Sequence, residues 1–97
     1  MVTWTDHALA QLKNIHNYIA QDSAFYAKRV SEAIVNKTKH LDELPYKNRK
    51  TPEINDEQFR EVSQYAYRIL YEIKTDKQIN VLAVIHKRSD FKAEDLP

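Results

Sequence analysis

The sequence predicts an α+β fold of order β-α-α-β-β-β, in which a helical hairpin packs on one face of a small twisted, mainly antiparallel sheet. In the first half, apolar residues recur at intervals of three and four, which is typical of one face of a helix. Between residues 67 and 74 they alternate with polar residues, which is typical of a strand. A length of 97 residues accommodates one hydrophobic core, so residues 1–97 are expected to form a single domain.

The N-terminal segment predicts a short strand followed by a helix. Val2-Thr3-Trp4 is β-prone, and Thr5 offers a side-chain oxygen to cap a helix with Asp6 in its first turn. That helix is expected to reach about Gln21. Its apolar face consists of Ala8, Leu12, Ile15 and Ile19.

A second helix is expected to begin after a cap at Ser23 and to stop before Pro45, which cannot continue a helix. Its apolar stripe consists of Ala27, Val30, Ile34, Leu41 and Leu44. This helix would have about 21 residues and a length of roughly 32 Å. Because only a residue or two separate the two helices, they should form an antiparallel hairpin with a shared apolar face.

The second half predicts a loop followed by three strands joined by short turns, which favours an antiparallel meander. The expected elements are a loop at Tyr46–Gln58, strands at Phe59–Gln64, 67–74 and Ile79–Ile85, a turn at Thr75–Gln78 and a charged tail at Ser89–Pro97. The segment Ile79–Ile85 is apolar at nearly every position, which indicates a central strand covered on both faces. The pattern leaves open where the first strand joins the sheet.

Composition excludes several classes of function. Fifteen Lys and Arg against 14 Asp and Glu leave a net charge of +1, which argues against sequence-blind binding of nucleic acid. The absence of Cys excludes disulfides, thiolate zinc sites and Cys nucleophiles, and the absence of Gly excludes phosphate-binding loops. Without Gly, left-handed turn positions are expected to fall on Asn or Asp.

Two further classes of site are not expected. The histidines show no metal-ligand spacing, so no metal site is expected. No cofactor is expected either. No apolar run is long enough to span a membrane, and a cytoplasmic location is the default expectation.

Four motifs occur in order along the chain. They are Pro52-Glu53, Arg60-Glu61-Val62, Tyr67-Arg68-Ile69-Leu70-Tyr71, and Val81-Leu82-Ala83-Val84-Ile85-His86-Lys87-Arg88. Together with the order of elements, they resemble the RelE/ParE superfamily of toxins from bacterial type II toxin–antitoxin systems, over essentially the whole chain. The resemblance implies a partner, a small antitoxin that wraps and neutralises the toxin in a hetero-oligomer.

One branch of this superfamily, the RelE-like toxins, cuts messenger RNA in the ribosome without a metal. Such cleavage needs a base, an acid and cations that stabilise the charge on the reacting phosphate. The resemblance places the candidate catalytic residues at Arg60, Arg68, His86 and Arg88. The set is incomplete in two respects. Val62 stands where the RelE-like toxins have a second cation, and the C-terminal tail lacks the Tyr that those toxins place there, since no Tyr follows Tyr71. A structural alternative for Arg68 is an ion pair with Glu61 or Glu72 across the sheet.

The other branch, the ParE-like toxins, shares the fold, has no nuclease site and poisons DNA gyrase. Its last strand typically ends in an aliphatic residue, His, any residue and Arg, followed by Asp and a bulky apolar residue. The run Ile85-His86-Lys87-Arg88-Ser89-Asp90-Phe91 has this form. The sequence therefore favours a gyrase poison that is not an enzyme, with the tail beyond Arg88 as the expected gyrase contact. A non-toxic interaction module of a toxin–antitoxin repressor complex stays open as a third interpretation.

Strict alternation along the last two strands predicts a surface for a partner. Leu70, Leu82 and Val84 are expected on the sheet face opposite the one formed by Ile69, Tyr71, Val81 and Ala83. Because so small a domain is not expected to cover both faces, this apolar strip should be exposed and should receive an antitoxin helix. Phe91 is the fourth residue expected to bind a partner.

Overall fold

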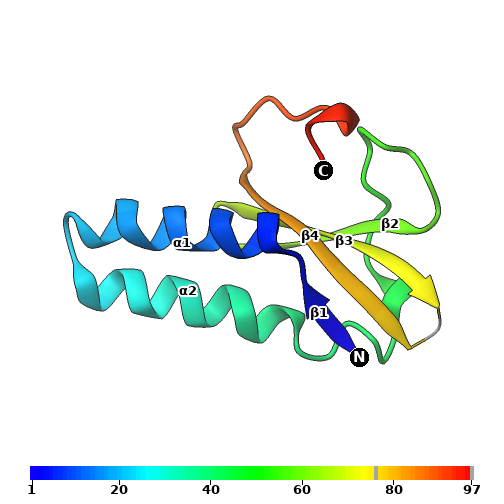
Figure 1. The fold of residues 1–97 in the computed structure, drawn as a ribbon, viewed down its shortest axis with the longest axis horizontal. Helices are drawn as coiled ribbons and strands as arrows, with labels where there is room; N and C mark the ends of the chain where they lie inside the picture. The colour runs from blue at the N-terminus through cyan, green and yellow to red at the C-terminus, as the bar shows by residue number, and fades with distance from the viewer. Residues whose placement is uncertain (76, 97) are drawn as a thin grey trace.

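The computed structural model describes residues 1–75 and 77–96; Asp76, which belongs to the expected turn, and Pro97 lie outside the described residues. The elements are β1 (Val2–Trp4), α1 (Asp6–Ala20), α2 (Ala24–Thr38), β2 (Phe59–Gln64), β3 (Tyr67–Thr75) and β4 (Gln78–His86), with short 3₁₀ helices η1 (Pro45–Lys47) and η2 (Ala93–Asp95). The helical hairpin lies against one face of the sheet, as Figure 1 shows. The predicted α+β class and element order are therefore confirmed. Among the described helices, none is both long and apolar enough to cross a membrane.

The sheet has the strand order β1-β4-β3-β2. The last three strands form the expected antiparallel meander, and β1 joins it parallel to β4. This pairing makes β4 an inner strand with α1 over it, which is why nearly every one of its positions is apolar. The strand β2 lies at an edge of the sheet.

Helix α1 follows the sequence prediction to within one residue at its C-terminal end. Thr5 caps it, since its hydroxyl accepts a hydrogen bond from the backbone N–H of Ala8 at 3.1 Å. Ala8 is fully buried and its partners Leu12, Ile15 and Ile19 pack against the same core. Gln11 adds a polar anchor, because its side-chain oxygen accepts a hydrogen bond from the backbone N–H of Val84 at 2.8 Å. That bond satisfies a donor of β4 beyond the point where β1 ends.

Helix α2 is shorter than the sequence predicts, because it ends at Thr38 rather than Leu44. Thr38 is buried, and its hydroxyl donates to the backbone oxygen of Val35 at 2.7 Å and accepts from the indole N–H of Trp4. Such a local bond competes with the helical pattern and favours an end to the helix. Leaving the helix lets Leu41 turn inward against Tyr71, whereas Leu44 is exposed.

A β-bulge in β4 changes which residues share a face of the sheet. The register pairs Ile69 with Val84 and Tyr71 with Val81, so Leu82 is the extra residue. Both Val81 and Val84 therefore pack against the helices. The prediction that Val84 lies on the other face of the sheet from Ile69 is wrong, as is the prediction that Ala83 shares the face of Ile69, because a bulge breaks the period of two on which both rest.

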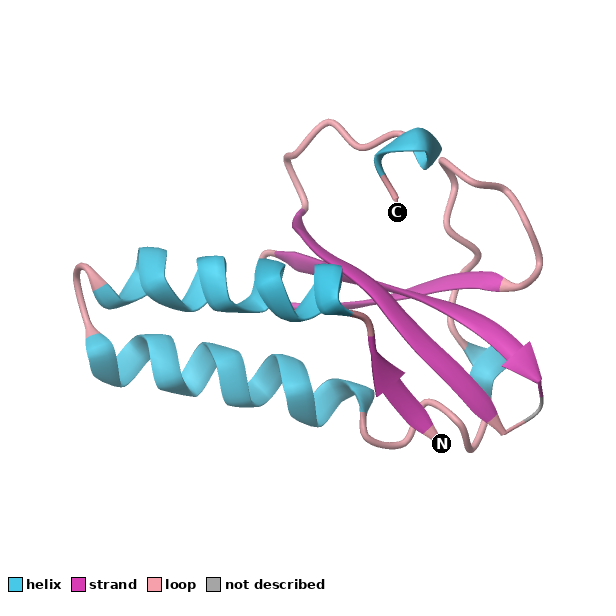
Figure 2. Cartoon of the chain, in the orientation of Figure 1, coloured by secondary structure: helices cyan, strands magenta, loops and turns pink. Residues whose placement is uncertain are grey.

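The face of the sheet away from the helices is covered by the chain itself. Leu70 and Ala83 are fully buried there. Ile54 of the long loop and Leu96 of the tail line a depression together with Leu82, and Figure 2 shows the loop and the tail close together. The predicted exposed apolar strip is therefore not present. The loop at 48–58 and the tail at 87–96, 21 residues in all, are enough to cover this face of a small sheet.

Two residues have positive φ among the described positions: Asn55 at 55° and Tyr65 at 54°. Asn55 agrees with the expectation that such turns fall on Asn or Asp. Tyr65 does not, and it occupies the first of two turn residues between β2 and β3. A tight two-residue hairpin needs positive φ at this place, so the topology imposes on Tyr a conformation that Gly would adopt without strain.

Replacing Tyr65 by Gly should therefore stabilise the protein by about 1 kcal/mol, since the strain of a bulky residue at positive φ is removed. The midpoint of urea unfolding measures the effect. Tyr65→Ala is the control, because it truncates the same side chain and keeps the strained backbone. A variant Tyr65→Gly no more stable than Tyr65→Ala would contradict this account.

Candidate functional site

The centre of the candidate catalytic set, Arg68, is held between two carboxylates. Its guanidinium donates to Glu53 at 2.8 and 2.7 Å and to Glu61 at 3.2 and 2.6 Å. The Arg68 side chain is 12% exposed and that of Glu61 only 4%. Arg49 lies on the outer side of the same cluster, with its Nε 3.4 Å from Glu61. All three guanidinium nitrogens of Arg68 are thus engaged, and two cations face two carboxylates.

The electrostatics of this cluster follow from its geometry. The hydrogen bonds from Arg68 hold the pKa of Glu53 below its ordinary value, and they outweigh the effect of partial burial, which raises it. The two carboxylates in turn raise the pKa of Arg68. The cluster joins the long loop to β2 and β3, so its charge state is linked to the stability of the fold.

The lowered pKa of Glu53 predicts a pH dependence of stability. A carboxyl whose pKa is lower in the folded chain stabilises it at pH values above the unfolded-state pKa, near 4.5, and this contribution is lost as the pH falls through the folded-state value. We expect Glu53→Gln to lower the free energy of unfolding by a constant amount above pH 6, and the difference from wild type to shrink below pH 4.5. Urea titrations at a series of pH values measure it. A difference that does not change with pH would contradict the prediction.

Arg60 is also held by neighbouring groups. Its guanidinium donates to the backbone oxygens of Glu57 and Asn48 at 2.9 and 3.1 Å and to the Glu57 carboxylate at 2.6 Å. The guanidinium carbon of Arg60 lies 5.2 Å from the centre of the Tyr46 ring. Arg60 therefore fastens η1 and the long loop to β2.

His86 and Arg88 lie at the other end of the sheet and are exposed. The Nδ1 atom of His86 accepts a hydrogen bond from the backbone N–H of Arg88 at 3.0 Å, and its ring meets that of Tyr67 edge-on, with 5.6 Å between the centres. Arg60 pairs with Tyr71, four residues along β3 from the partner of His86. That separation is roughly 13 Å along the strands. The structure therefore brings His86 and Arg88 together and leaves Arg60 apart from them.

The four residues expected to bind a partner lie in different environments. Leu70 and Val84 are buried, on opposite faces of the sheet, and neither is accessible. Leu82 is half-buried in the depression beneath the tail. Phe91 is half-buried, and its ring centre lies 6.0 Å from the guanidinium carbon of Arg68. The tail is thus anchored to the arginine cluster through Phe91.

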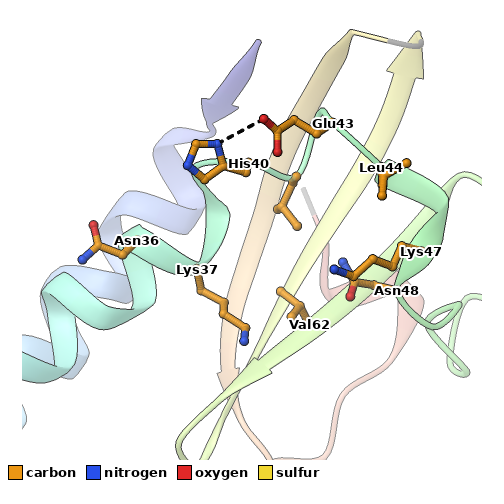
Figure 3. A pocket seen from close by; sticks show the side chains of 9 residues that line it. Asn36, Lys37, His40, Glu43, Leu44, Lys47, Asn48 and Val62 are labelled. Carbon is orange, nitrogen blue, oxygen red and sulfur yellow. Dashed lines mark ion pairs between the residues drawn. The ribbon is translucent and has the colours of Figure 1, made fainter.

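A cleft that the sequence did not indicate lies between the end of α2 and the edge strand β2. Figure 3 shows the side chains that surround it. Its volume is about 320 Å³. It is lined by Asn36, Lys37, His40, Leu41, Glu43, Leu44, Lys47, Asn48 and Val62. His40 and Glu43 pair at 3.6 Å, whereas Lys37 and Lys47 form no ion pair with any described residue. The cleft is present because α2 ends at Thr38. The sequence predicted a helix that continues to Leu44, and that longer helix gave no indication of a cleft here.

The backbone next to the cleft is partly unpaired. On the outer edge of β2, Phe59 accepts from the backbone N–H of Thr51 at 2.9 Å and Glu61 donates to Arg49 at 3.0 Å. Because every second residue of an antiparallel strand faces outward, the next outward residue is Ser63. Its N–H and C=O have no backbone partner across this edge among the described residues.

Within residues 1–75 and 77–96, no group of three or more His, Cys, Asp or Glu side chains is placed to hold a metal ion. What the described geometry provides is an arginine cluster that fastens loops, a cationic cleft beside an open strand edge, and an exposed histidine and arginine at the end of β4.

Comparison with known proteins agrees with this fold. A family model described as the ParE toxin of the type II toxin–antitoxin system parDE matches residues 2–91. None of the curated proteins matches this sequence. A solved structure, the chromosomal ParDE toxin–antitoxin system from P. aeruginosa, superposes with a TM-score of 0.71 and 20% identity, over 88% of this chain and 92% of the other. The family match covers nearly the whole chain, and we conclude that this chain belongs to the ParE toxin family of type II toxin–antitoxin systems.

Proposed function

We propose that this protein arrests growth by poisoning DNA gyrase and that a cognate antitoxin neutralises it. The observation that carries the proposal is the engagement of Arg68 by Glu53 and Glu61. A nuclease arginine must have donors free to stabilise charge on a reacting phosphate. Four of the five N–H donors of Arg68 are engaged by the two carboxylates, which also cancel its positive charge.

The separation of Arg60 from His86 along the sheet also argues against RNA cleavage. Arg60 is engaged by backbone oxygens and by Glu57, far along the strands from His86. An acid, a base and two cations around one phosphate would have to lie within hydrogen-bonding reach of it. The domain is better suited to binding another macromolecule than to metal-free cleavage of RNA.

Purified toxin added to a gyrase supercoiling assay tests the proposal. We expect loss of supercoiling together with accumulated gyrase–DNA cleavage complexes, and filamentation with SOS induction in cells. Ribosome-dependent cuts in messenger RNA with intact supercoiling would instead indicate the RelE-like activity. Unchanged growth on expression without antitoxin would indicate a non-toxic module of a repressor complex.

For the antitoxin we propose the cleft beside β2 in place of the buried strip. The open backbone groups of Ser63 suit a partner segment that adds as a strand to this edge. Alternate side chains of such a segment would face the cleft, where Val62 and Leu41 are apolar. Lys37 and Lys47 suit acidic side chains on the same segment.

Ser63→Pro tests this docking mode, because proline removes the outward N–H while the ladder with β3 does not use it. We expect the affinity for the cognate antitoxin to fall by about tenfold, the loss typical of one important interface residue. Ser63→Ala is the matched control and should bind as wild type. Equal affinity of the Pro variant, with an unchanged circular dichroism spectrum, would place the antitoxin elsewhere.

A further inference from the structure

A group of tyrosines that the proposed function does not use lies at the closed end of the helical hairpin. In Figure 1 this end of α1 and α2 extends beyond the strands. Tyr18 near the end of α1 and Tyr26 near the start of α2 are 72% and 52% exposed. Tyr67, at the start of β3, packs against the same core as Ile19, the neighbour of Tyr18. Burial raises the pKa of the Tyr67 phenol, and the phenols of Tyr18 and Tyr26 raise it further. Exposed aromatic groups gathered in this way are unusual on a chain that acts alone.

The residues that follow β4 add positive charge beside Tyr65 and Tyr67. The backbone N–H of Lys87 donates to the backbone oxygen of Ala66 at 2.8 Å, so Lys87 lies against the turn that contains Tyr65. His86 contacts the ring of Tyr67, and Arg88 bonds to His86. Lys87 and Arg88 form no ion pair with any residue in the described part of the chain. Tyr65 and Tyr67 thus lie next to the segment that carries these two cations.

Tyr65 supplies an independent observation. It is half-exposed, and its backbone is strained at a position where Gly would relax it. A costly conformation held by a large exposed side chain indicates that the side chain serves a purpose outside the fold. Because Tyr65 adjoins Lys87 and Tyr67, that purpose belongs to the same surface.

We propose that Tyr18, Tyr26, Tyr65 and Tyr67, with Lys87 and Arg88, form the surface that engages the toxin's target, and that they bind an acidic, partly apolar protein surface of gyrase. This assignment rests on the proposed function and identifies the surface through which the toxin would bind gyrase. Tyrosines bury large area at small entropic cost and are enriched among residues that dominate binding energy. Two cations without partners select an acidic surface, and the chain's net charge of +1 favours protein over nucleic acid as the occupant.

Supercoiling assays with the double variant Tyr18→Ala/Tyr26→Ala test the proposal. We expect the concentration for half-inhibition to rise at least about tenfold, because both side chains are exposed and their loss leaves the core intact. The matched control is Phe25→Ala, which removes an aromatic side chain that is 70% exposed on a different face of α2, beside Arg29. That variant should inhibit gyrase as wild type does. Lys87→Glu/Arg88→Glu should weaken inhibition most at low salt.

Tyr65→Gly separates a role in binding from a role in folding, since it should raise stability and still weaken inhibition. Wild-type toxin that inhibits gyrase, with the double tyrosine variant equally potent, would overturn this surface and leave the proposed function standing. Wild-type toxin without any effect on gyrase would overturn both. Fluorescence anisotropy with a labelled DNA duplex alone is the last arm: tight binding by wild type that the tyrosine variant loses would identify nucleic acid as the occupant and overturn the assignment to protein.

Discussion

Val84→Asp is expected to leave the protein unfolded at 25 °C, whereas Leu82→Asp is expected to leave it folded. Val84 is 2% exposed and packs between the sheet and the helices against Ile69 and Val30. Replacing Val84 removes the stabilisation from burying its apolar side chain, about 2 kcal/mol. It also places a carboxylate in the core at a cost of several kcal/mol. The sum is comparable to the whole stability of a domain of this size, about 5–15 kcal/mol.

Leu82 differs because the bulge places it on the opposite face, half-buried beneath the tail. A carboxylate there can reach water by displacing the tail, so we expect a loss of about 1–3 kcal/mol. Far-UV circular dichroism and thermal melts of the two variants measure the contrast. Similar melts for both would mean that the strand alternates regularly, with Leu82 and Val84 on one face.

Removing the guanidinium of Arg68 should cost about 3–5 kcal/mol, because it leaves the carboxylate of Glu61 buried without its main partner. Only Arg49 would then remain near Glu61, at 3.4 Å from an exposed position. We expect Arg68→Ala to lower the melting temperature strongly. Loss of the contact to Phe91 should release the tail as well.

Two controls distinguish this structural role from catalysis. Arg49→Ala should cost less than about 1 kcal/mol, since its pair with Glu61 is largely exposed. The double variant Arg68→Met/Glu61→Leu should recover much of the stability lost by Arg68→Ala, because it removes both charges rather than one. A fully stable Arg68→Ala protein would contradict the structural role and return Arg68 to the list of available cations.

The local elements could be read from the sequence because each depends on neighbours along the chain. The cap at Thr5, the apolar face from Ala8 to Ile19 and the alternation in β3 are local signals, and the structure follows them. The end of α2 was misplaced because an apolar stripe continues whether or not the helix does. The bond from Thr38 to Val35 and the burial of Leu41 against Tyr71 are properties of the folded chain.

The candidate site was predictable only in part. The pairing of Arg68 with Glu61 was one of two alternatives that strand geometry allowed, and the second carboxylate, Glu53, comes from a loop whose path the sequence did not define. The cleft beside β2 and the tyrosines at the end of the hairpin had no sequence signal, because they join segments that are far apart in the chain.

By itself, the sequence determined the class of fold, the hairpin, the antiparallel meander and the likeness to a toxin family, since periodicity and motif order are written in consecutive residues. Only the tertiary structure decided where β1 joins the sheet, on which face Val84 lies and whether the arginines are free. Each of these depends on contacts between distant residues: parallel pairing with β4, one extra residue in a strand, and carboxylates supplied from a loop. A one-residue bulge reverses the faces of a strand without changing its composition, and so no pattern of hydrophobicity could have reported it.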